Sequence, residues 1–65
     1  MFIVEVFGYS CGYYSNDPIM TRRFNTLIEA RRFAIRHDRV YRVSFINELD
    51  TNGRLIDNGI HERIG

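Results

Sequence analysis

Three side chains of this sequence have the chemistry of a nucleophile, a general base or a soft metal ligand: Cys11, His37 and His61. A nucleophilic cysteine needs a neighbouring base and a third group that orients that base. No spacing in the chain predicts such a constellation, and Cys11 belongs to neither a papain-like nor a Cys-x-x-Cys motif. One cysteine and two histidines are also too few for a structural zinc site. We therefore expect no catalytic residue, no metal and no cofactor.

Glycine motifs that bind phosphate are incomplete in this chain. Gly8-x-x-x-Gly12 follows an apolar segment. However, a Walker motif needs Gly-Lys-Ser/Thr before a helix, and the dinucleotide fingerprint needs a third glycine. Glu48 and Asp50 flank a predicted turn and most simply keep it hydrated. A chain of 65 residues also seldom encloses the concave pocket that a hydrolase requires.

Tyrosine and arginine form the pattern that favours recognition of a partner. Tyr9, Tyr13 and Tyr14 stand among Gly, Ser and Asn, and Arg22 and Arg23 follow closely. Rigid amphipathic rings among small polar residues are typical of antibody paratopes, and Tyr and Arg are enriched at interface hot spots. These five residues are our candidate partner-binding residues. The alternative is that the tyrosine rings fold over an uncovered face of the protein.

All nine basic residues of the chain are arginine, and lysine is absent. The planar guanidinium group binds carboxylate or phosphate through two parallel hydrogen bonds, which ammonium does not do. Arg31, Arg32 and Arg36 form a secondary basic patch that suits phosphate or an acidic protein surface; the alternative is an ordinary solvated face. Eight acidic residues leave a net charge of only +1. Nucleic-acid affinity would therefore require the two signs to lie on different faces.

Length and composition predict one small domain that comprises residues 1–65. The chain is 45% apolar and 26% charged, which is typical of globular proteins. No apolar run approaches the roughly 20 residues needed to span a bilayer, and no signal-peptide pattern is present. A single cysteine suits a reducing compartment. We expect a cytoplasmic location, in the host cytoplasm if the protein is viral.

The first half of the chain reads as strand, loop, strand and helix. Alternating apolar residues predict a strand over Phe2–Phe7, turn-forming residues predict a loop over 8–18, and Ile19–Phe24 fits a second strand. Thr26-x-x-Glu29 has the capping-box form, so a helix should run from Leu27 to His37. The apolar stripe of this helix comprises Leu27, Ala30, Phe33, Ala34 and His37.

The second half predicts a hairpin. The Asn52-Gly53 turn lies between Val40–Glu48 and Arg54–Asp57, which should pair as antiparallel strands, while residues 60–64 fit a strand or a helical turn. The fold class is therefore α+β, a three- or four-stranded antiparallel sheet with one helix on one face, in the order β-β-α-β-β. The second face meets water, a partner or a second copy, and a homodimer is one expectation. Ile28 and Ile35 lie outside the apolar stripe, so either the stripe is wide or these two residues form a second contact, as they would in a homodimer.

A resemblance narrows the class of function. The helix segment Phe24-x-Thr26-Leu27-x-Glu29-Ala30-x-x-x-Ala34 and the hairpin around Asn52-Gly53 are similar to small phage-encoded accessory proteins, among them anti-CRISPR inhibitors. The likeness covers roughly residues 20–57 and transfers no binding residue. It implies a phage protein that inhibits a host or defence macromolecule by protein–protein contact. A toxin-neutralising or regulatory protein would have the same sequence features.

The residues themselves leave two classes of function open. The first is a non-catalytic protein that binds, and thereby blocks, another protein through Tyr and Arg anchors. The alternative is a nucleic-acid-binding protein in which Tyr rings stack on bases and Arg side chains contact phosphates. The nearly balanced charge favours the first class.

Overall fold

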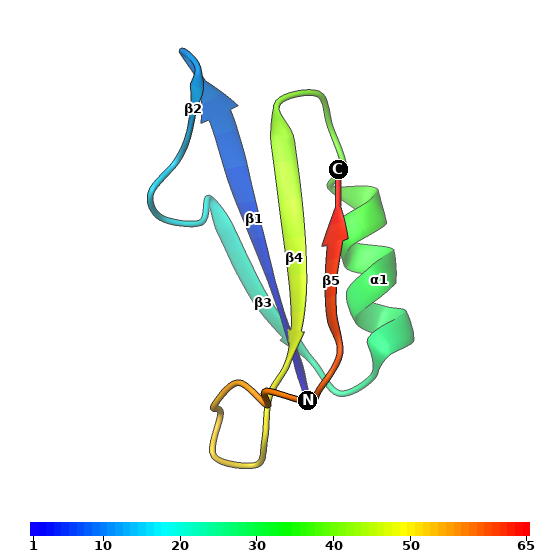
Figure 1. Ribbon diagram of the computed structural model, residues 1–65. Helices are drawn as coiled ribbons and strands as arrows, with labels where there is room; N and C mark the ends of the chain where they lie inside the picture. The colour runs from blue at the N-terminus through cyan, green and yellow to red at the C-terminus, as the bar shows by residue number, and fades with distance from the viewer.

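The computed structural model covers residues 1–65 and contains one helix and five strands (Figure 1). The elements are β1 (Phe2–Ser10), β2 (Tyr13–Tyr14), β3 (Met20–Phe24), α1 (Leu27–Arg36), β4 (Arg42–Glu48) and β5 (His61–Ile64). Every strand pair is antiparallel. The predicted α+β class, with a single helix and an antiparallel sheet, is confirmed. The helix is too short and too polar to cross a membrane.

Strands β1 and β4 lie in the middle of the sheet. They pair from Phe2 opposite Glu48 to Gly8 opposite Arg42. On its other side β1 pairs with β3 over its first half and with β2 near its end, so β2 and β3 share one edge. Strand β5 forms the opposite edge through its pairing with β4. The central place of β1 explains why both of its faces are rich in apolar residues.

The predicted loop over residues 8–18 is wrong at its start, because β1 continues to Ser10 and turns back into β2. Cys11 and Gly12 make this turn with φ angles of 54° and 87°. Two successive positive φ values are typical of the type I′ turn, which matches the twist of a hairpin. Cysteine is not a usual residue at such a turn, which is why the sequence pattern did not indicate a hairpin. Beyond β2, Ser15 N donates to Gly8 O at 2.7 Å, and residues 16–18 form a loop before β3.

The helix begins at Leu27 as predicted and ends at Arg36, one residue before the predicted end. Thr26 is its N-cap: the Thr26 Oγ1 atom accepts a hydrogen bond from Glu29 N at 3.3 Å and donates one to Glu29 Oε1 at 2.8 Å. His37 is the C-cap, with its N–H donating to Phe33 O at 3.1 Å. Ala30 and Ala34 are fully buried. Their small side chains let α1 lie close against β1 and β4.

The predicted strand Arg54–Asp57 is wrong, since the region holds only one isolated bridge, between Leu49 and Leu55. Glu48 already binds the chain that enters β5. Glu48 N donates to Ile60 O at 2.9 Å, and the Glu48 carboxylate accepts from Ile60 N at 3.0 Å. Gly59 packs so tightly there that a Cβ atom would lie 3.0 Å from the Glu48 Cβ. Residues 49–60 therefore form a folded loop, and the partner of β4 is β5.

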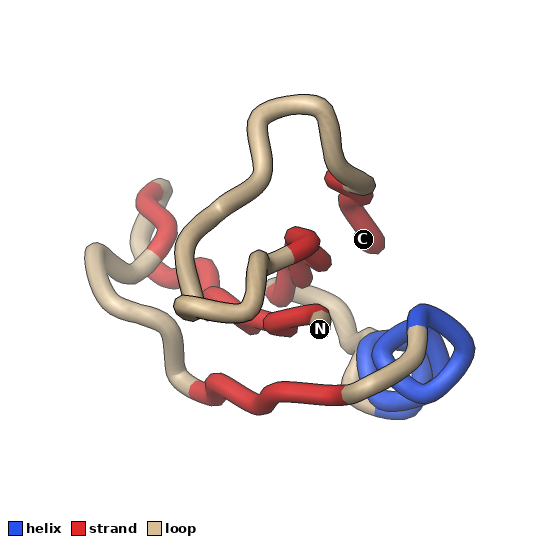
Figure 2. The backbone as a smooth tube through the Cα atoms, turned by 90° about the horizontal axis from the view of Figure 1, so that it is seen from below, coloured by secondary structure: helices blue, strands red, loops and turns tan.

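The helix covers only one face of the curled sheet, as the end-on view in Figure 2 shows. Val4, Val6 and Ile46 point toward α1 and form the fully buried core with Ala30 and Ala34. We call the opposite face the open face. The strand registers place alternate residues of the two central strands on it, namely Ile3, Glu5, Phe7 and Tyr9 of β1 and Val43, Phe45 and Asn47 of β4.

Candidate functional site

The nucleophile and base candidates lie apart on different elements. Cys11 is exposed at the tip of the β1–β2 hairpin. His37 ends α1, and its ring packs 4.4 Å from the Phe33 ring. The His61 ring lies 2.8 Å from both Asn47 Oδ1 and Ile56 O. No group of three His, Cys, Asp or Glu side chains is arranged to hold a metal ion.

Three tyrosine rings lie side by side across one end of the open face, and we call Tyr14, Tyr9 and Tyr41 the tyrosine row. The sheet register places Tyr9 opposite Tyr14, and Tyr9 N donates to Tyr41 O at 2.7 Å. The Tyr9 and Tyr14 rings meet edge to face with centroids 4.9 Å apart. The Tyr9 and Tyr41 rings are nearly parallel, at 11°, with centroids 6.3 Å apart. Tyr13 adds a ring that is 79% exposed at the neighbouring hairpin tip, so all four tyrosines gather at this end.

A hollow of about 330 Å³ lies beside the tyrosine row on the open face. Its lining residues are Phe7, Tyr14, Val43, Phe45 and Arg63. Val43 is buried, while the Phe7 and Phe45 rings are half-buried and meet edge to face at 5.8 Å. The hollow is therefore apolar inside, with one cation in its lining. We call it the open-face hollow.

The charges around the open-face hollow are asymmetric. Phe45 of β4 lies between Glu5 of β1 and Arg63 of β5 in the sheet register. Because neighbouring strands are about 4.8 Å apart, Glu5 and Arg63 flank Phe45 from opposite sides. No ion pair joins them: the hydrogen bond from Arg63 runs from its Nε atom to Gly65 O at 3.3 Å. The hollow thus has a cationic border on the β5 side and an anionic one on the β1 side.

The structure separates Arg22 and Arg23 from the tyrosines. They pair with Val4 and Ile3, near the start of β1, whereas Tyr9 lies near its end. Neighbouring residues of a strand point to opposite faces. Arg23 accordingly lies on the open face, while the Arg22 guanidinium lies 5.8 Å from the centre of the Phe33 ring on the helix side. Tyr13 and Tyr14 are near Arg22 in sequence, but the long β1 strand holds the two groups at opposite ends.

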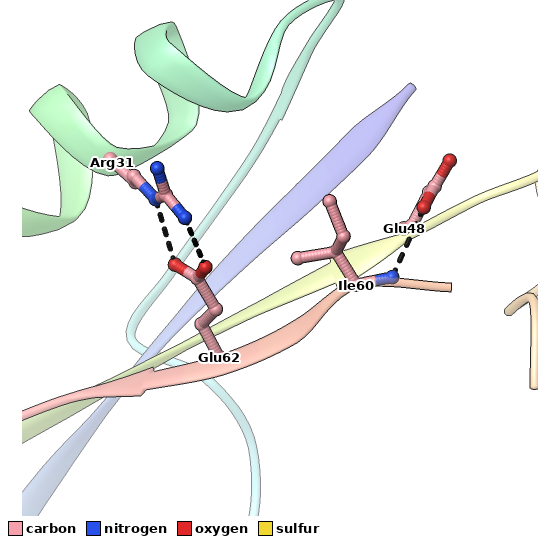
Figure 3. A network of polar contacts seen from close by, with 4 residues as sticks. All are labelled: Arg31, Glu48, Ile60 and Glu62. Carbon is pink, nitrogen blue, oxygen red and sulfur yellow. Dashed lines mark hydrogen bonds and ion pairs between the residues drawn. The ribbon is translucent and has the colours of Figure 1, made fainter. Parts of the chain in front are cut away.

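Of the three arginines in the secondary basic patch, one forms an ion pair within the protein and the other two are exposed. Arg31 binds Glu62 of β5 through two hydrogen bonds, one of them from Nε to Oε1 at 2.9 Å (Figure 3). The hydrogen bond from Arg31 lowers the pKa of the Glu62 carboxyl, and the same bond raises the pKa of Arg31. Arg32 and Arg36 are exposed. They share the outer side of α1 with Ile28 and Ile35, which are 61% and 63% exposed.

Several residues of the open face were not candidates from sequence: Phe7, Tyr41, Phe45 and Arg63. The alternation of Tyr41, Val43 and Phe45 was visible in the sequence. Only the register with β1 and β5 shows that these side chains share a face with Tyr9 and Arg63. No family model matches the chain, and no curated protein or solved structure matches it.

Proposed function

We propose that the chain is a non-catalytic binding protein that recognises a protein partner through the tyrosine row and the open-face hollow. One observation carries the proposal: three tyrosines and two phenylalanines gather on the sheet face that no helix covers. Contiguous exposed aromatic surface on a small protein is typical of an interaction site. Tyrosine supplies large contact area at little conformational cost, and it is enriched among residues that dominate interface energetics.

The proposed biological role is inhibition of a host or defence macromolecule by a phage-encoded protein, the role that the resemblance to anti-CRISPR inhibitors implies. Occupying a surface of a larger machine needs no catalytic group, so an exposed aromatic face is sufficient for it. The exposed, unpaired Cys11 supports action in a reducing cytoplasm.

Single-stranded nucleic acid is the alternative partner, and the parallel rings of Tyr9 and Tyr41 favour it because bases stack on such rings. The distribution of the arginines argues against it. Arg22 packs over Phe33 and Arg31 binds Glu62, while Arg32 and Arg36 lie on the helix, away from the open face. A nucleic-acid groove needs cations that follow the backbone. Beside the tyrosine row the cations are Arg63 near Tyr14, and Arg39 and Arg42 near Tyr41, where Asp38 adds an opposing charge.

The proposal is tested by capture of the partner from a lysate of the native host on the immobilised chain, with and without nuclease. We expect a protein to be retained after nuclease treatment. Capture should fail with Tyr41→Ala. Ile28→Ala, which truncates a similarly exposed side chain on the helix, is the matched control and should capture normally.

A second measurement addresses the alternative directly. Fluorescence anisotropy with labelled dT20 and rU20 should show only weak binding. The measurement is made at about 50 and 200 mM salt, because a protein that binds phosphates loses affinity steeply over this range. Tight, salt-sensitive binding that Tyr41→Ala abolishes would replace the protein-binding proposal with the nucleic-acid alternative.

A further inference from the structure

The open-face hollow is lined mostly by apolar and aromatic residues and is large enough to admit one apolar side chain. At about 330 Å³ it lies at the lower limit of small-molecule sites. Val43 is only 3% exposed. The Phe7 and Phe45 rings also line the hollow, and their planes make an angle of 73° with each other. The hollow is therefore walled by rings in two orientations, which suits insertion of a side chain better than flat stacking of a base.

Arg63 gives this hollow a definite electrostatic preference. Its Nε atom donates to Gly65 O, and the two terminal nitrogens of its guanidinium have no partner. Arg31, in contrast, is already satisfied by Glu62. A free guanidinium fork beside an apolar surface binds a carboxylate through two parallel hydrogen bonds. Glu5, on the far side of Phe45, disfavours a second carboxylate on the β1 side.

We infer that the open-face hollow binds a segment of the partner protein in which an apolar side chain is followed directly by a carboxylate. The apolar side chain enters the hollow and packs against the Phe7 and Phe45 rings, and the carboxylate pairs with the Arg63 guanidinium at the β5 border. This inference rests on the proposed function and specifies its chemistry: the partner surface is acidic at this point, and the complex has one defined orientation across the sheet.

The test uses the full chain, labelled with ¹⁵N, and four synthetic probes in NMR titrations. Acetyl-Gly-Phe-Asp-Gly-amide is the expected ligand. Acetyl-Gly-Phe-Asn-Gly-amide lacks the charge, acetyl-Gly-Gly-Asp-Gly-amide lacks the apolar side chain, and N-acetyl-phenylalanine represents a free small carboxylate. We expect saturable shifts at Phe7, Phe45 and Arg63 with the first peptide. The Asn peptide should bind about two- to fivefold more weakly, the range that one exposed ion pair contributes. The peptide without phenylalanine should bind about tenfold more weakly or worse, because it loses a large apolar contact.

Variants of the chain assign the effect to the guanidinium. Arg63→Gln should remove the preference for Asp over Asn in the peptide, and Arg63→Lys should retain part of it. Arg32→Gln makes the same charge change on the helix and should leave the preference intact. Arg63 is exposed, and circular dichroism of each variant verifies that the fold is retained.

Three outcomes would overturn the inference: equal binding of the Asp and Asn peptides, an unchanged preference in Arg63→Gln, or binding of N-acetyl-phenylalanine at least as tight as that of the peptide. The last outcome would identify the ligand as a free small molecule. Loss of partner capture in Tyr41→Ala together with equal binding of the two peptides would reject this inference alone. Normal capture by Tyr41→Ala would reject the proposed function itself.

Discussion

Replacing Ile46 by valine tests whether the stability of this protein depends on the single layer between α1 and the sheet. Ile46 is 0% exposed and belongs to the core cluster that includes Val4, Ala30 and Ala34. The change deletes one buried methylene, worth about 0.8 kcal/mol in transfer free energy, and leaves a small cavity. We expect a loss of about 1 kcal/mol. For a domain of this size that lowers the melting temperature by roughly 4–8 °C.

The assay is thermal and urea unfolding followed by circular dichroism. The matched control is Ile35→Val, which makes the same chemical change at a residue that is 63% exposed on the outer side of α1. It should alter the free energy of unfolding by less than about 0.5 kcal/mol. Equal losses at Ile46 and Ile35 would refute the reasoning, because Ile35 would then be buried in solution, against a second copy or another part of the chain.

Four further predictions follow from particular contacts. Thr26→Ala removes the N-cap hydroxyl and should cost about 1 kcal/mol in urea unfolding, whereas Thr26→Ser should restore most of it. Cys11→Asn should stabilise the β1–β2 hairpin by roughly 0.5–1 kcal/mol, since Asn tolerates positive φ better than Cys, and Cys11→Val should destabilise it; equal melting temperatures would contradict this. The pKa of Glu62 is lowered in the folded state, so its ion pair with Arg31 stabilises the protein fully at pH values above the usual Glu pKa near 4.5. The stability difference between wild type and Glu62→Gln should therefore shrink as pH falls through the lowered folded value, and a difference independent of pH would refute the pairing. Light scattering should return the monomer mass of 7.7 kDa, which agrees with the small effect expected for Ile35→Val; a doubled mass would instead support the homodimer through Ile28 and Ile35 that was one expectation from the sequence.

Local patterns in the sequence were sufficient to predict several elements. The Thr26-x-x-Glu29 box sets the start of α1 because its hydrogen bonds lie within one turn of the chain. The spacing of Ala30 and Ala34 predicts the buried side of the helix, and the apolar alternation in Phe2–Phe7 predicts a strand. Each of these signals depends only on neighbours a few residues away, so it can be recognised in the sequence without knowledge of the fold.

The hairpins were harder to predict because local turn signals compete with contacts between distant segments. Asn52-Gly53 does make a turn, with Gly53 at a φ of 83° and the Asp50 carboxylate accepting from Asn52 N at 2.8 Å. Nevertheless β4 pairs with β5, because Glu48 binds Ile60 through both its main chain and its side chain. The Cys11-Gly12 turn was missed for the opposite reason: its residues are not a familiar pair, and its geometry follows from the pairing of Tyr9 with Tyr14.

The sequence by itself determined the α+β class, with a single helix on one face of an antiparallel sheet, and it made tyrosines and arginines the candidates for recognition. Only the tertiary structure decided which of those residues lie together. Tyr41 lies beside Tyr9, and Arg63 lies beside Phe45, because segments more than ten residues apart in sequence pair with each other. Arg22 pairs near the start of β1, so the length of this strand separates it from Tyr9. Side-chain period fixes the face on which a residue lies within its own strand. The register between strands depends on the whole sheet, so the residues that face each other on neighbouring strands are known only from the folded structure.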